Sequence, residues 1–141
     1  MTYREEFERI ARKHNGILRP ADVVDEARNP DSILHRAFEW DDTVAAEAYR
    51  IQQAKELIRV QVVVIENRQE PVRAFVSLSR DRLTDGGYRI TADVLNDRDL
   101  YREMLLDAAD ELRSFQRKYN RITELSEVFA AAKAFDRKAT R

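Results

Sequence analysis

The sequence predicts a helix-rich α+β fold: short N-terminal helices and a central helix lead into a β-hairpin, and long C-terminal helices follow. Residues 41–65, DDTVAAEAYRIQQAKELIRVQVVVI, pass from apolar side chains spaced three and four apart to a run of β-branched residues. Residues 72–78 alternate apolar and other side chains in the manner of a second strand. Residues 101–122 repeat apolar side chains at alternating spacings of four and three, which is typical of packed helices.

Chain breakers divide the N-terminal part into short helices. Apolar spacing predicts a first helix over residues 3–14, and the Asn-Gly pair after it ends that helix because glycine adopts left-handed backbone at low cost. Pro20 suits the first position of a second helix, since its missing N–H needs no partner there. This helix includes residues 21–28, and an Asn-Pro pair ends it. A short third helix is predicted over residues 32–40.

The central helix begins where Asp41, Asp42 and Thr43 offer capping oxygens. Its apolar stripe is predicted to consist of Val44, Ala48, Ile51 and Ile58, with Ala54 and Leu57 beside them.

A hairpin is predicted from strands at residues 60–66 and 72–78, with the sequence NRQEP at its tip. Pro71 is tolerated at the start of the second strand. Residues 79–87 are predicted to form a loop that contains a Gly-Gly pair, and residues 88–90 to form a short third strand.

The C-terminal helices carry the seam that suggests self-association. Its predicted interface residues are Tyr101, Leu105, Ala108, Leu112, Phe115, Tyr119 and Ile122. Leu125 and Phe129 are shifted by one residue, which predicts a break at residues 120–123, with Thr123 as the cap of a separate final helix. A helix of roughly 22 residues is ~33 Å long. A two-stranded hairpin cannot cover that length, so we expect a homo-oligomer.

The chain is therefore organised into an N-terminal helical region, residues 1–59, and a hairpin region, residues 60–97, that packs with it as one domain. Residues 98–141 form the expected oligomerisation region. The net charge of the whole chain is −1, and residues 98–141 carry ten Lys and Arg against eight Asp and Glu. This is not the strong basic excess of a protein whose whole surface binds nucleic acid, so DNA contact would need a local patch.

Composition makes an enzyme the least favoured class. The chain has no cysteine, which excludes disulfides and thiol chemistry, and its only histidines are His14 and His35. Glu103, Asp107 and Asp110 share a helix face but lack the histidine partner of bundle metal sites. No nucleotide, hydrolase or metalloprotease motif is present, so we expect no catalytic residues, no cofactor and no metal. The amphipathic N-terminus and the lack of a long apolar run predict a protein of the cytoplasm with no membrane partner.

The central helix is the first candidate for DNA contact. The order helix, helix, helix, hairpin resembles a winged helix-turn-helix, with NRQEP as the wing. Its predicted DNA-binding residues, taken to lie on the wet side of the helix beside Tyr49, are Arg50, Gln53, Lys55 and Arg59. The N-terminal turn of the helix carries Asp41, Asp42 and Glu47, which phosphates would repel, so an ordinary solvated face remains the alternative.

A basic cluster in the last third is the second candidate. Arg113, Arg117, Lys118 and Arg121 lie between Leu112 and Thr123 with no acidic residue among them, and could meet phosphates. Phe115 and Tyr119 are interleaved with them but belong to the seam, which favours a packing role. A solvated helix face is again the alternative.

Three stretches carry a resemblance to known proteins: FEWDDTVAAEAYRIQQAKELIR, VRAFVSLS and LRSFQRKYNRITELSEVFAA. Over roughly residues 15–132 the chain resembles a set of small uncharacterised proteins from phages and prophages. The resemblance implies a phage or prophage setting inside a bacterial host cell and transfers no catalytic residue. By association, it favours DNA-handling, regulatory or assembly roles.

Two functional hypotheses follow from these observations. The first is a non-enzymatic, oligomeric, phage-type protein that binds or handles DNA. The second is a structural or adaptor protein that contacts a copy of itself, or another phage protein, through the C-terminal seam.

Overall fold

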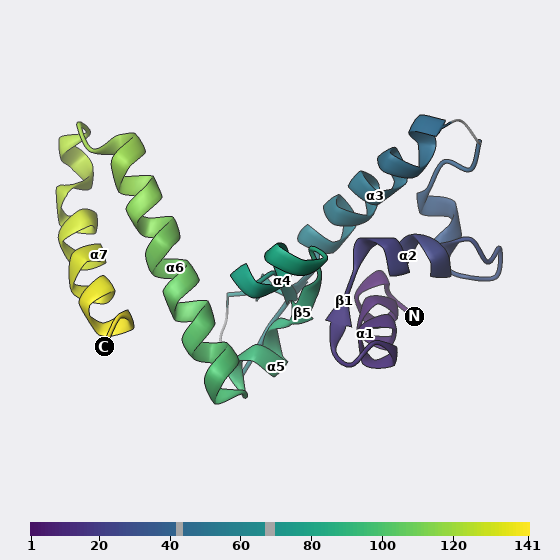
Figure 1. The fold of residues 1–141 in the computed structure, drawn as a ribbon, viewed down its shortest axis with the longest axis horizontal. Coiled ribbons are helices and arrows are strands. Elements are labelled where there is room, and N and C mark those ends of the chain that lie inside the picture. The colour runs from purple at the N-terminus through teal and green to yellow at the C-terminus, as the bar shows by residue number, and fades with distance from the viewer. Residues whose placement is uncertain (42–43, 67–69) are drawn as a thin grey trace. The chain divides into compact units, whose positions relative to one another are not determined.

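The computed structural model describes residues 1–41, 44–66 and 70–141. It confirms the helix-rich α+β class (Figure 1). The chain divides into two compact units, Met1–Asp93 and Val94–Arg141, so the boundary lies four residues before the predicted one.

The first helix, α1 (Tyr3–Lys13), begins with a capping box in which Thr2 and Glu5 satisfy each other's backbone N–H groups. It ends as predicted: Asn15 and Gly16 have φ angles of 59° and 85°, and the Gly16 N–H donates to a carbonyl in the last turn. A strand that the sequence did not predict, β1 (Ile17–Leu18), follows directly.

Helix α2 (Pro20–Ala27) has proline at its first position, as predicted. The predicted third helix is wrong in extent, because the structure forms only a 3-10 turn, η1 (His35–Ala37). Side-chain contacts hold this segment: the Trp40 indole donates to the His35 carbonyl, and the two rings stack 5.0 Å apart. These local contacts replace the hydrogen bonds of a longer helix.

The central helix, α3 (Val44–Arg59), packs against α2. The predicted caps Asp42 and Thr43 lie outside the described residues, as does the side chain of Val44. Its buried stripe is rotated from the predicted one. Arg50, Ala54 and Ile58 are almost completely buried, whereas Ala48 is exposed.

The predicted hairpin is present but short. Strand β2 (Val62–Val63) pairs antiparallel with β3 (Val72–Arg73), with Val62 opposite Arg73, and residues 67–69 of the predicted tip lie outside the described residues. The predicted second strand divides at Ala74. Its continuation, β4 (Phe75–Val76), pairs with β5 (Tyr88–Ile90), the predicted third strand, and β5 pairs in turn with β1.

The predicted loop at residues 79–87 is wrong, because residues Ser79–Thr84 form a helix, α4. Asp81 on this helix is buried and forms a bidentate ion pair with Arg89 of β5 at 2.9 Å, a tertiary contact that fixes the helix in place. Gly87 is required by a close approach, since a Cβ there would lie 2.5 Å from the side chain of Ile17. A short unpredicted helix, α5 (Thr91–Leu95), follows β5.

The core of the first unit lies where α1, α2, α3 and the three-stranded sheet meet. The Phe7 and Phe75 rings pack edge to face at 6.0 Å. The completely buried apolar members of this core are Phe7, Ile10, Ala11, Leu18, Val23, Val24, Ala27, Leu34, Ala54 and Ile58.

The second unit contains the long helix α6 (Arg98–Tyr119), the 3-10 turn η2 (Thr123–Leu125) and the final helix α7 (Ser126–Ala139). Asp97 caps α6 through hydrogen bonds from two backbone N–H groups. The predicted break is confirmed, and α6 and α7 run antiparallel side by side (Figure 1). Thr123 is not a cap: α7 begins after Leu125 with no side-chain cap, because η2 occupies the position where Thr123 would act.

Candidate functional site

The predicted DNA-facing side of α3 is partly interior. Arg50 is only 2% exposed, so its predicted position on the wet side of the helix is wrong. Its Nε donates to the Glu39 carbonyl at 2.6 Å, and its guanidinium carbon lies 4.9 Å from the centre of the Trp40 ring. The guanidinium also lies 3.2 Å from the Glu47 carboxylate and donates to the Asp41 carbonyl at 3.4 Å, so its planar group is held on several sides. Arg50 therefore fastens the α2–α3 connection to α3.

The other predicted residues of this helix differ in exposure. Arg59 is exposed, Lys55 and Gln53 are half-buried, and the Gln53 Oε1 atom is buried without a hydrogen-bond partner in the described part of the chain. Near the start of α3, the Glu47 carboxylate accepts a hydrogen bond from Arg28 at 2.6 Å, which lowers the pKa of Glu47. Phosphates would meet a carboxylate at this end of the helix.

The basic cluster of α6 divides into a bound arginine and three outer cations. Arg113 forms ion pairs with Asp110 and with Asp136 of α7, which raise its pKa, with the Asp136 contact the larger cause. Arg113 thus links the two helices.

The outer cations, Arg117, Lys118 and Arg121, are exposed near the end of α6. Lys118 lies 5.2 Å from the centre of the Tyr119 ring. A shallow pocket of about 190 Å³ opens at the same place, and its lining residues are Arg113, Gln116, Arg117 and Asn120. The predicted phosphate-binding stripe is thus reduced to a small basic surface at one end of the α6–α7 helix pair.

The predicted seam of α6 is only partly covered. Leu105, Ala108, Leu112 and Tyr119 are half-buried, whereas Tyr101, Phe115 and Ile122 are 41–43% exposed. The one fully buried residue of α6, among those described, is Ala109, outside the predicted seam. Phe115 reaches α7 through Phe129, with ring centres 6.1 Å apart.

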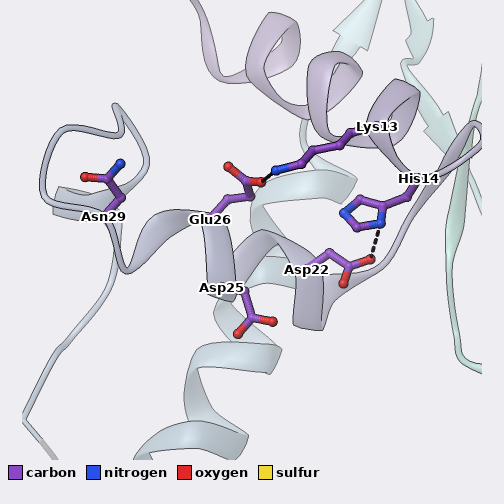
Figure 2. A pocket seen from close by; sticks show the side chains of 6 residues that line it. All are labelled: Lys13, His14, Asp22, Asp25, Glu26 and Asn29. Atoms are coloured by element: carbon purple, nitrogen blue, oxygen red, sulfur yellow. Dashed lines mark hydrogen bonds and ion pairs between the residues drawn. The ribbon is translucent and has the colours of Figure 1, made fainter.

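Sequence reasoning missed a polar pocket of about 290 Å³ between α1 and α2 (Figure 2). Lys13 and His14, at the end of α1, face Glu26 and Asp22 of α2: the Lys13 Nζ lies 2.6 Å from Glu26, and the His14 Nδ1 lies 3.7 Å from Asp22. The sequence contains a pattern that points to this pocket, because Asp22 and Glu26 are four residues apart and so share one helix face.

The chemistry of this pocket is that of an ion-pair network. The Lys13 hydrogen bond, and then a hydrogen bond from Arg9 at 2.9 Å, lower the pKa of Glu26. Asp22 also lies 3.8 Å from Arg19. The carboxylates of Glu26 and Asp22 thus each lie close to a cation of the same unit, and this network fastens α1 to α2.

The described residues contain no cluster of three or more histidine and carboxylate side chains arranged to hold a metal ion. Within the same residues, no helix combines the length and the apolar composition that crossing a membrane requires.

Comparison of the chain with protein families, with curated proteins and with solved structures found no match. The functional conclusion therefore depends on the geometry of the chain itself.

Proposed function

We propose that the protein is a non-enzymatic, self-assembling structural or adaptor protein that works inside a bacterial cell, in a phage or prophage setting. Assembly proceeds through the α6–α7 hairpin. The observation that carries the proposal is the exposure of large apolar side chains along this hairpin: Tyr101, Phe115, Ile122 and Val128 are 41–48% exposed.

The hairpin has little interior of its own to compensate for that exposure. Among the described residues of α6 and α7, only Ala109, Phe129 and Ala139 are buried. An isolated pair of helices gains most of its stability from packing an apolar face, so further cover on this face is favourable. Four-three spacing along α6 suits a helical partner, and a second copy supplies the same spacing.

Self-assembly is tested by the mass of the protein in solution. Replacing Tyr101 and Ile122 together by Asp changes two exposed seam residues and leaves Phe129 in place. We expect light scattering to give a mass above one chain for the unmodified protein and a lower mass for the double variant, because two charges would be buried in the interface.

Leu83→Asp is the matched control for that experiment. Leu83 lies in α4 of the first unit and is 86% exposed, so its substitution should leave the mass unchanged. Circular dichroism checks that both variants keep their helix content. An unmodified protein with the mass of one chain at all concentrations would contradict self-assembly through the hairpin.

The second candidate function is DNA binding, and it is supported by the exposed cations Arg117, Lys118 and Arg121 at the end of α6. Assembly would bring several such weak patches together and raise the affinity for a long polyanion. The test is fluorescence anisotropy with labelled single-stranded and duplex DNA at low salt. Binding should weaken steeply with salt and be lost in a variant with all three cations changed to Glu; flat titrations with both probes would eliminate this function.

A further inference from the structure

The outer edge of the two-stranded sheet carries a second interaction surface, separate from the hairpin helices. Val62 and Val64, in and directly after β2, are 53% and 55% exposed, and their spacing of two places them on one face of the extended segment. Proteins usually protect such an edge with lysine, proline or a covering segment, because its backbone groups and apolar side chains attract other strands. Here valines occupy these positions.

The hydrogen-bond pattern shows which backbone groups the edge presents. The Ala74 N–H donates to the Gln61 carbonyl at 2.9 Å, and the register places Val62 opposite Arg73 and Val63 opposite Val72. In an antiparallel pair, residues alternate between bonding the neighbouring strand and pointing away from it. Gln61 and Val63 therefore bond the neighbouring strand, and Val62 directs both its N–H and its C=O to the open side.

We propose that the open edge of β2 pairs antiparallel with the same edge of a second copy of this chain, on a twofold axis that passes through Val62. In this register the two Val62 residues exchange two reciprocal hydrogen bonds. The two exposed Val62 side chains then lie side by side on one face of the joined sheet. A twofold contact of this kind uses the same patch on both copies.

Charge favours the antiparallel pair of identical strands. Arg59 precedes the valine-rich segment and Glu66 ends it, and both side chains are exposed. Antiparallel pairing brings the Arg59 end of one strand beside the Glu66 end of the other, whereas parallel pairing would place like charges together. The same segment of a second copy therefore has the charge that each end of this edge favours.

Cysteine crosslinking of the full chain tests the axis, because the chain has no native cysteine. Directly opposite residues of a hydrogen-bonded pair have Cα atoms about 5.5 Å apart, within the range of a disulfide. With oxidised glutathione as the oxidant, Val62→Cys should form a disulfide-linked dimer with twice the mass of one chain on a non-reducing gel.

Val64→Cys is the matched control, since Val64 is the same residue type and is 55% exposed, against 53% for Val62. The two copies of Val64 would be four residues apart along the paired strands, or ~13 Å, so this variant should remain uncrosslinked. Circular dichroism verifies the fold of both variants. The proposal is overturned if Val62→Cys stays at the mass of one chain, which is the result expected if the edge binds a foreign peptide instead of a second copy. It is also overturned if Val64→Cys crosslinks equally well.

A charge exchange supplies the second measurement. Adding Arg59→Glu to Val62→Cys should reduce the crosslinked fraction, and adding Glu66→Arg as well should restore it. The antiparallel arrangement would be overturned if the crosslinked fraction stayed the same after Arg59→Glu, or if it did not recover after Glu66→Arg was added. These residues all belong to the first unit, so the outcome is independent of assembly through the C-terminal helices.

Discussion

The two units of the chain bury their apolar residues to very different extents. In Met1–Asp93, three helices and a sheet enclose a continuous core in which Phe7, Leu18 and Ile58 are completely buried. In the α6–α7 hairpin, Phe129 is the only large side chain among those described that reaches a buried position. The first unit therefore has the core of an independent domain, whereas the second leaves apolar side chains such as Tyr101 and Phe115 exposed.

Two ion pairs, one from each unit, illustrate the same contrast. The Asp81–Arg89 pair of the first unit lies in the interior, with side chains 5% and 16% exposed. The Arg113–Asp136 pair that joins α6 to α7 is 40% and 30% exposed, so water and salt screen it. Added salt should therefore weaken the Arg113–Asp136 pair more than the Asp81–Arg89 pair.

The largest expected effect is the loss of a core aromatic residue in the first unit. Phe7→Ala should lower the free energy of unfolding by about 3–5 kcal/mol, because it removes a completely buried ring and leaves a cavity against Phe75. Phe115→Ala, in the hairpin, should cost about 1 kcal/mol, since that ring is 42% exposed. Urea unfolding followed by circular dichroism measures both, and equal losses would contradict the contrast between the units.

An intermediate effect is expected at Arg50. Arg50→Lys should lower the free energy of unfolding by about 1–3 kcal/mol, because an ammonium cannot keep the planar contact with Trp40 and all the hydrogen bonds of the guanidinium. Trp40 is the only tryptophan, so its fluorescence reports this site directly. Arg59→Lys, at an exposed position of the same helix, should change stability by less than ~0.5 kcal/mol.

Arg50 also shows why part of the candidate site could not be predicted from sequence. Periodicity identified α3, but it located the buried stripe by apolar residues alone. Among the described side chains of α3, this stripe includes an arginine, four residues before Ala54 and eight before Ile58. A charged side chain becomes interior only where acceptors surround it, and two of the acceptors are the carbonyls of Glu39 and Asp41, on the connection before the helix. The spacing of residues within α3 does not predict that the segment before the helix folds back against it.

The fold was predictable where local chemistry determines it. Proline at the start of α2, left-handed Gly16 after α1 and the broken apolar register after α6 all mark real boundaries. The missed elements, β1, α4 and α5, contain two, six and five residues, too few to show a period. They are fixed by tertiary contacts, among them the Asp81–Arg89 pair. Exposure along the predicted α6 seam likewise depends on where α7 packs, which the seam alone does not determine.

The smallest expected effect concerns the ion pairs that fasten α1 to α2. Because Lys13, and then Arg9, lower the pKa of Glu26 below its ordinary value of 4.5, the folded state binds a proton at this carboxylate less readily than the unfolded chain does. The stabilisation is therefore fully present above pH 4.5 and is lost as the pH falls through the lowered folded pKa. Glu26→Gln should remove up to about 1 kcal/mol at neutral pH and almost nothing in strong acid. Urea unfolding from neutral to acid pH measures the difference between the two proteins, which should shrink below pH 4.5. A difference that stays constant with pH would mean that Glu26 contributes by packing rather than by charge.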